Sequence, residues 1–180
     1  MAHTTYDSTI KVLQGILQTL SHILRKAEKH ADANAETLLA ARLADDMYPL
    51  ADQVRLATQF SEYVIARLTG REARSFGGNP ASLAECHERI ETVLRAAKEA
   101  DRDEVNRNGD EVKPTTLVPG EDPVDMSGGA YAHVATLPNI YFHAVTAYGI
   151  LRKEGVPLGK RDYYTGFFPA PPAASGAAAS

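Results

Sequence analysis

The sequence is short of cysteine and of positive charge. It has one cysteine in 180 residues, and its 19 lysines and arginines are outnumbered by 23 acidic residues. One cysteine cannot form an internal disulfide or a cysteine-rich zinc site. A formal net charge of −4 provides neither a basic stripe for nucleic acid nor a polybasic patch for a membrane surface. The length still suits one domain with a core of its own.

Several catalytic motifs are also missing from the sequence. It contains no Gly-rich phosphate loop, no Gly-x-Ser-x-Gly elbow, no His-Glu-x-x-His pair and no Glu-x-x-His pair. This argues against nucleotide-dependent and di-iron chemistry. The first residues show no basic leader followed by an apolar core, so we expect a cytoplasmic, reducing location. In that setting Cys86 is expected to be a small core residue.

The least ordinary stretch is free of charge. No Asp, Glu, Lys or Arg occurs between Asp125 and Arg152. About 20 apolar residues can span a bilayer. This stretch, however, contains two histidines, a proline and an asparagine, which are unfavourable in lipid. We therefore predict a helix of a soluble bundle and no membrane association.

Apolar residues recur at spacings of three and four in four segments, as in amphipathic helices. The first helix is expected to be capped by Asp7 or Ser8 and to end at residues 32–34. The second is expected to have Pro49 in its first turn and to stop at Gly70.

The third helix is expected to start at Asn79, as the N-cap, with Pro80 in the first turn. The fourth is expected to run from a Ser127 cap to Glu154, with Gly155 ending it. Pro138 should kink this helix or divide it.

The connections are expected to be irregular. Residues 101–113 are charged and predicted to be solvated, and residues 115–118 and 124–126 flank a turn sequence typical of a small hairpin. The pattern predicts an all-α four-helix bundle over residues 1–166, with the hairpin between helices three and four. The length of that connection permits a crossover. Residues 167–180, rich in Ala, Pro and Ser, are predicted to form a disordered tail.

Two polar residues fall near the apolar face of the second helix. Asp46 lies one turn before Leu50, and Gln53 lies one turn before Ala57. A buried carboxylate or amide needs a partner, so these residues are candidates for a site. The alternatives are that Asp46 caps the helix and that Gln53 is a partly exposed edge residue.

The fourth helix aligns Thr136, Asn139 and His143 on one side, with aromatic residues such as Tyr148 nearby in sequence. Histidine suits proton transfer near neutral pH and is the commonest metal ligand. The alternative is a buried neutral histidine with both nitrogens hydrogen-bonded. His22, opposite the apolar stripe of the first helix, is expected to be solvated.

Three strings resemble signatures of the family called domain of unknown function nineteen-ninety-three, which belongs to the DinB/YfiT-like helical bundles. They are ARLADDMYPLADQV at residues 41–54, PNIYFH with TAYGILR within residues 138–152, and GVPLGKRDY at residues 155–163. The resemblance spans residues 5–166. It implies the bundle fold and a tendency to dimerise.

The resemblance also implies a divalent metal held by three histidines, one on the second helix and a His-x-x-x-His pair on the fourth. This sequence departs from that pattern. The fourth helix has Asn139-x-x-x-His143, and the second has Asp46 or Gln53 in place of a histidine. Because an amide is a weak ligand for zinc or nickel, we expect no cofactor. A divalent metal on His143 and Asp46 is kept as an alternative.

Our leading hypothesis is a small-molecule enzyme of isomerase, lyase or cyclase type. His143 and Asp46 would do acid/base chemistry. The substrate would be bound by Gln53, Asn139, Thr136 and Tyr148. One alternative is a non-catalytic, stress-related or binding protein that dimerises through the fourth helix. Another is a metal-dependent hydrolase or transferase of DinB type. No nucleic-acid partner is expected.

Overall fold

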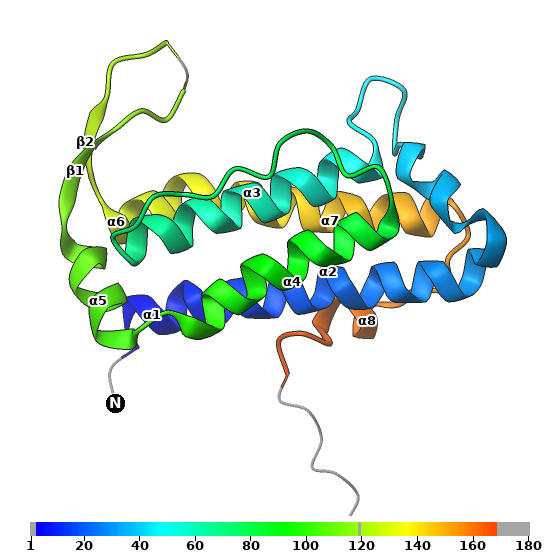
Figure 1. The fold of residues 1–180 in the computed structure, drawn as a ribbon, viewed down its shortest axis with the longest axis horizontal. Helices are drawn as coiled ribbons and strands as arrows, with labels where there is room; N and C mark the ends of the chain where they lie inside the picture. The colour runs from blue at the N-terminus through cyan, green and yellow to red at the C-terminus, as the bar shows by residue number, and fades with distance from the viewer. Residues whose placement is uncertain (1–2, 119, 169–180) are drawn as a thin grey trace, which may run out of the picture.

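The computed structural model describes residues 3–118 and 120–168, apart from the side chains of residues 32 and 33. It is mostly helical, with one small two-stranded sheet (Figure 1). The elements are α1 (Thr5–Ser8), α2 (Ile10–Ala31), the 3₁₀ segment η1 (Asp32–Ala40), α3 (Leu50–Leu68), α4 (Leu83–Glu99), α5 (Arg102–Asp110), β1 (Val112–Thr115), β2 (Val124–Ser127), α6 (Gly128–Ala130), the π-helical segment η2 (Tyr131–Thr136), α7 (Leu137–Lys153) and α8 (Lys160–Tyr164).

Four long helices surround the core. α2 packs against α4, α4 against α3, α3 against α7, and α7 against α2. In Figure 1, α2 and α7 run in one direction and α3 and α4 in the other. The α2–α4 pair and the α3–α7 pair, two opposite sides of this arrangement, are therefore each antiparallel. The connection from α3 to α4 runs back along the molecule, so the topology is not a plain up-down-up-down order.

The apolar stripes read from the sequence form this core. Leu13, Leu17, Leu20 and Leu24 of α2 are all fully buried, as the spacing predicted. They pack with the buried faces of the other three long helices in one cluster. Burying a leucine side chain stabilises a fold by roughly 2 kcal/mol, so this stripe is a main source of stability.

Three predicted helix starts are wrong. Pro49 is the N-cap of α3, which begins at Leu50, and does not lie inside its first turn. Thr4, not Asp7 or Ser8, caps the N-terminal helix, and α2 begins afresh at Ile10. Asn79 does not cap α4, because Ser82 accepts the hydrogen bond from Glu85 N instead. For α1 and α4, another hydroxyl side chain a few residues away provides the cap through a local hydrogen bond.

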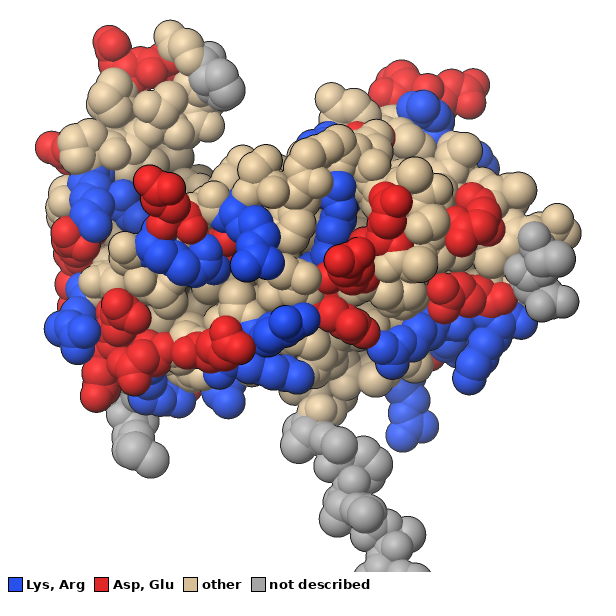
Figure 2. Space-filling view, viewed as in Figure 1, with Lys and Arg blue, Asp and Glu red and all other residues tan. Residues whose placement is uncertain are grey.

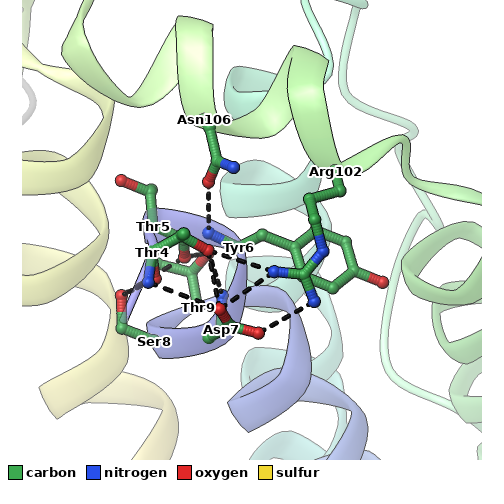
Figure 3. Close-up of polar contacts among 8 residues, drawn as sticks. All are labelled: Thr4, Thr5, Tyr6, Asp7, Ser8, Thr9, Arg102 and Asn106. Atoms are coloured by element: carbon green, nitrogen blue, oxygen red, sulfur yellow. Dashed lines mark hydrogen bonds and ion pairs between the residues drawn. The ribbon is translucent and has the colours of Figure 1, made fainter. Parts of the chain in front are cut away.

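The N-terminal turn is fixed to α5 by polar contacts (Figure 3). Arg102 donates two hydrogen bonds of 2.9 Å to the carboxylate of Asp7, and its guanidinium lies 4.4 Å from the centre of the Tyr6 ring. Asn106 accepts a hydrogen bond from Tyr6 N. The hydrogen bonds from Arg102 and Thr4 hold the pKa of Asp7 well below its usual range.

The charge-free stretch forms three consecutive helical segments. Ser127 caps α6, as predicted, through a hydrogen bond from Ala130 N. The π-helical segment η2 then lies immediately before Pro138, which stands in the first turn of α7. The helix thus changes from π to α geometry next to Pro138, where the sequence predicted an irregularity, but Thr136 and Leu137 both keep αR backbone angles, so it is not interrupted there. At the other end Gly155 has a φ of 85°, and Val156 N donates to Leu151 O, which closes α7 as the sequence predicted.

The connection between α4 and α7 is more ordered than predicted. Residues 102–110 form α5, whose Val105 is fully buried, so this charged segment is not simply a solvated linker. The hairpin exists, but its first strand is β1, three residues before the predicted position. Val112 pairs with Ser127, and Thr115 pairs with Val124.

The segment after α7 returns to α2. Phe167, the first residue of the predicted tail, packs over Gly15, where an added Cβ would come within 2.7 Å of the ring. Residues 169–180 of that tail lie outside the described residues. No helix in the described part of the chain combines the length and hydropathy that crossing a bilayer requires.

Candidate functional site

The candidate site is centred on one histidine between α3 and α7. His143, on α7, is 6% exposed, and its Nδ1 lies 2.8 Å from Oε1 of Gln53 on α3. Gln53 is 1% exposed, and its Nε2 donates to the carbonyl oxygen of Tyr48 at 2.9 Å. The sequence placed both residues near inward faces, and the structure brings them together.

This hydrogen-bond chain fixes the protonation of the ring. Because the amide nitrogen of Gln53 donates to Tyr48, its oxygen is the atom that faces His143 and can only accept. Nδ1 of His143 must therefore carry the proton, which leaves Nε2 with a free lone pair. Among the described residues, no hydrogen bond joins Nε2 to another side chain or to the backbone.

The surroundings keep the ring uncharged. Burial is the main cause that lowers the pKa of His143 from 6.5 to about 4, and the positive charge of Arg55 lowers it further. Asp52 opposes this shift. The imidazole is consequently neutral at physiological pH.

Arg55 and Asp52 are held in a closed network beside the pair. Arg55 Nη2 donates to Asp52 Oδ1 at 2.9 Å, and Arg55 Nε donates to Asn79 Oδ1 at 2.6 Å. Asn79 Nδ2 then donates to Asp52 Oδ2 at 3.0 Å. Each of the three side chains contacts the other two, so the Asp52 carboxylate is neutralised and fixed in place.

Aromatic rings cover the histidine. The Phe60 ring lies nearly parallel to the imidazole, with centroids 6.0 Å apart, and Phe142 meets it edge-on at 5.4 Å. Phe60 also contacts Tyr63 edge-on at 6.0 Å. A row of rings therefore leads from His143 along α3 toward the hairpin. It gives the histidine an apolar surrounding, which accounts for its lowered pKa.

Comparison with known proteins identifies the family. A family model described as "Domain of unknown function (DUF1993)" matches residues 5–164. The chain belongs to the DUF1993 family. It is also similar to the crystal structure of a DinB family member from Shewanella denitrificans, with 32% identity, a TM-score of 0.79 and 95% of each chain covered. No curated protein matches the chain.

In this DUF1993 chain, the second predicted acid/base residue does not reach the histidine. α3 begins at Leu50 with Pro49 as its N-cap, so Asp46 lies in the exposed turn before the helix. The expectation that Asp46 shares a helical face with Leu50, and the alternative that it caps the helix, are both wrong. The carboxylate that lies close enough to influence His143 is Asp52.

The other predicted substrate-binding residues are dispersed. Thr136 is buried, but its hydroxyl donates to the carbonyl of Tyr131 within η2. Asn139 is half-buried one turn before His143. Tyr148 lies edge-on to Tyr163 of α8, with centroids 6.3 Å apart. Asn139 is therefore the one whose position on the helix suits a role beside His143.

The residues around His143 do not fit the metal site typical of DinB bundles. Gln53 Oε1 already accepts from His143, and both oxygens of Asp52 are bound by Arg55 and Asn79. In the described parts of the chain, no three His, Cys, Asp or Glu side chains come together as metal ligands would. A single imidazole nitrogen is too few ligands for a stable divalent site.

Sequence reasoning missed the Asp52–Arg55–Asn79 network and the role of the Tyr48 carbonyl. The expected role of Asn79 as a helix cap hid its contact with Asp52. Asp52 could have been noticed as a carboxylate between two inward-facing positions, Ala51 and Gln53, because such a group needs partners. The carbonyl of Tyr48 carries no sequence signal.

Proposed function

We propose that this protein is a four-helix bundle of the DinB type that binds a small molecule beside His143. Nε2 of the neutral imidazole would accept a hydrogen bond or a proton from that molecule. The observation that supports this most strongly is the asymmetry of the ring. One nitrogen is fixed by a buried amide, and the other has no protein partner among the described residues.

The low pKa suggests what kind of chemistry the ring would do. A histidine with a pKa near 4 is uncharged at pH 7, so the lone pair of Nε2 is available as an acceptor. Such a ring is a weak base, and a proton that it takes from the ligand is returned readily. A proton that is taken up and returned within one turnover suits an isomerase, a lyase or a cyclase. Gln53 would keep the ring oriented, and Asn139 would hold a carbonyl or hydroxyl group of the ligand.

The experiment is a ligand-observed NMR screen with a panel of small phenols, enols and hydroxy-carbonyl compounds. His143→Ala is compared with His30→Ala, which removes an exposed histidine near the end of α2. We expect the compounds that bind the wild type to bind His30→Ala as well and not to bind His143→Ala. Equal binding to both variants would contradict the proposal.

A chemical probe tests the free nitrogen directly. Diethyl pyrocarbonate acylates unprotonated imidazole, and peptide mapping by mass spectrometry assigns the modified histidine. Because the pKa of His143 is about 4, we expect its relative reactivity to stay constant from pH 5.5 to 8. A reactivity that rises with an apparent pKa near 6.5 would contradict a neutral ring.

One observation favours a second candidate, a non-catalytic dimeric binding protein. The outer face of η2 and α7 exposes Val134, Tyr141, Phe142 and Val145. An apolar stripe on a helical stretch that has no charged side chain before Arg152 suits a seam between two copies. A Phe142→Lys/Val145→Lys variant should then be monomeric by light scattering at concentrations where the wild type is dimeric. A wild type that is monomeric throughout would rule this candidate out.

A further inference from the structure

A hollow lies on the side of the molecule opposite the α3–α7 pair. It is a groove of about 590 Å³ between α2 and α4, closed at one end by the segment after α8. The side chains that matter most are Gln18, Ser21 and Arg25 on α2, Arg95 and Lys98 on α4, and Thr165 after α8. His143 is not part of its lining.

The groove is positively charged in a negatively charged protein. Three lysine or arginine side chains and one carboxylate, Glu91, line it, whereas the whole chain carries −4. In Figure 2, Lys and Arg atoms alternate with Asp and Glu atoms along the lower half of the molecule, where Figure 1 shows α2 and α4, so the excess of cations belongs to the lining of the groove and not to this whole face. A concave surface with excess charge of one sign concentrates ligands of the opposite sign.

The charges are divided between the two ends of the groove. At one end Arg25 lies 3.7 Å from Glu91, and both side chains are about 60% exposed, so their mutual attraction is weak. At the other end Arg95 and Lys98 share one turn of α4. Within residues 3–118 and 120–168 neither has an ion-pair partner. The excess positive charge is therefore at the end lined by Arg95 and Lys98.

Neutral polar groups and apolar surface complete this lining. Thr19 binds both Tyr163 O and Gly166 N, which places Thr165 and Gly166 beside residues 15–19 of α2. The amide of Gln18 thus lies at the same end as Arg95 and Lys98, and Thr165 lines this end while its hydroxyl donates to Arg161 O at 3.1 Å. Further along, Leu94 and Ile90 provide an apolar floor.

An oxyanion would use both cations as charge-assisted hydrogen-bond donors. We propose that this groove binds a small phosphate ester with an apolar body. Arg95 and Lys98 hold the phosphate with the amide of Gln18, and the apolar part of the ligand lies over Leu94. The Arg25–Glu91 pair lies at the far end of the groove, away from the phosphate. This site is separate from the one around His143.

The test uses phenyl phosphate and inorganic phosphate as probes, titrated into the full-length ¹⁵N-labelled protein at low salt. We expect saturable shifts at Gln18, Leu94, Arg95, Lys98 and Thr165, with phenyl phosphate binding at least about fivefold tighter because its ring covers apolar surface. Arg95→Gln/Lys98→Gln should weaken binding by at least about tenfold. Lys29→Gln/Arg107→Gln removes the same charge from exposed positions outside the groove and should leave binding within about twofold.

The outcomes distinguish this site from general electrostatics and from a membrane surface. Equal losses in the two double variants would mean attraction to net charge alone and would overturn the proposal. So would the absence of saturation with phenyl phosphate at millimolar concentration. The protein should not co-sediment with vesicles that contain phosphatidylserine. If the wild type does co-sediment and Arg95→Gln/Lys98→Gln does not, the two cations would bind a lipid surface instead, and the proposal would be overturned. Shifts around His143 in place of the groove would also contradict two separate sites.

Discussion

The α3–α7 pair and the α2–α4 pair differ in how they treat polar groups. Between α3 and α7, His143 and Gln53 are almost fully buried and bonded to each other, and α7 carries no charged side chain before Arg152. Between α2 and α4, Arg25, Arg95 and Lys98 line a groove open to solvent. The α3–α7 pair thus buries polar side chains against each other, whereas the α2–α4 pair leaves its polar side chains hydrated.

This difference decides which residues are costly to change. A buried donor or acceptor that loses its partner costs about 1–3 kcal/mol, whereas a solvated charge can be removed at little cost. Variants of the α3–α7 pair should therefore alter stability. Variants of the α2–α4 groove should alter binding and leave stability nearly unchanged.

The largest effect should come from pH. The pKa of His143 is lowered from 6.5 to about 4 in the fold, so between these values the unfolded state binds more protons than the folded state. The stability from a neutral His143 is complete above pH 6.5 and is lost as the pH falls to 4, by up to roughly 3 kcal/mol. Urea unfolding between pH 7.5 and 4 measures this loss.

The matched control for the pH experiment is His143→Gln, which cannot titrate. Its stability should vary less than that of the wild type over the same range. Asp162 does not interfere with this experiment. Its pKa is lowered from 3.8 to about 2, so its contribution to stability is lost only as the pH falls below 3.8, outside the range from pH 7.5 to 4. An identical slope in His143→Gln would show that another group is responsible.

Gln53→Leu should have the next largest effect. It leaves Nδ1–H of His143 without its acceptor and the carbonyl of Tyr48 without its donor, with an expected loss of about 2 kcal/mol. Urea unfolding at pH 7.5 is the measurement. Gln18→Leu, an exposed glutamine of the α2–α4 groove, is the control and should change stability by less than about 0.5 kcal/mol. Similar losses in both variants would remove the contrast between the two sides.

Asp162→Asn should have a smaller effect, on the α2 side. Burial opposes ionisation of Asp162, but hydrogen bonds from Gly159 N, His22 and Lys26 outweigh it and lower its pKa to about 2. The side chain is 18% exposed, and the amide keeps some of these bonds, so we expect a loss of about 1–2 kcal/mol. Thermal unfolding measures it. Asp103→Asn on exposed α5 should be close to neutral.

The fold was largely predictable because its helices are long and strongly periodic. The stripe of α2, the Ser127 cap, the irregularity next to Pro138 and the end at Gly155 all follow from local chemistry. The short elements were harder. In α5 a single fully buried valine, Val105, anchors a charged helix, and its burial depends on contacts far away in sequence.

The site was predictable only in part, for a similar reason. Helical spacing placed His143 and Gln53 near inward faces, but Asp46 was assigned to a helix that begins four residues later. Likewise His22 was expected to be solvated, yet its Nε2 lies 2.8 Å from Asp162, far along the chain. Periodicity predicts the orientation of a residue within a helix, while its partners depend on the arrangement of the whole chain.

The smallest stability effect should come from Arg95→Gln/Lys98→Gln. Both cations are exposed and have no ion-pair partner in the described residues. The free energy of unfolding should therefore change by less than about 0.5 kcal/mol. A slight gain is reasonable, because the variant removes repulsion between like charges on one turn. A loss near 2 kcal/mol would mean that these cations hold the fold together, as Gln53 does. In that case the two helix pairs would not differ in the way the structure indicates. Weaker phosphate binding by this variant could then reflect partial unfolding, so the binding would have to be measured again under conditions where the variant is as stable as the wild type.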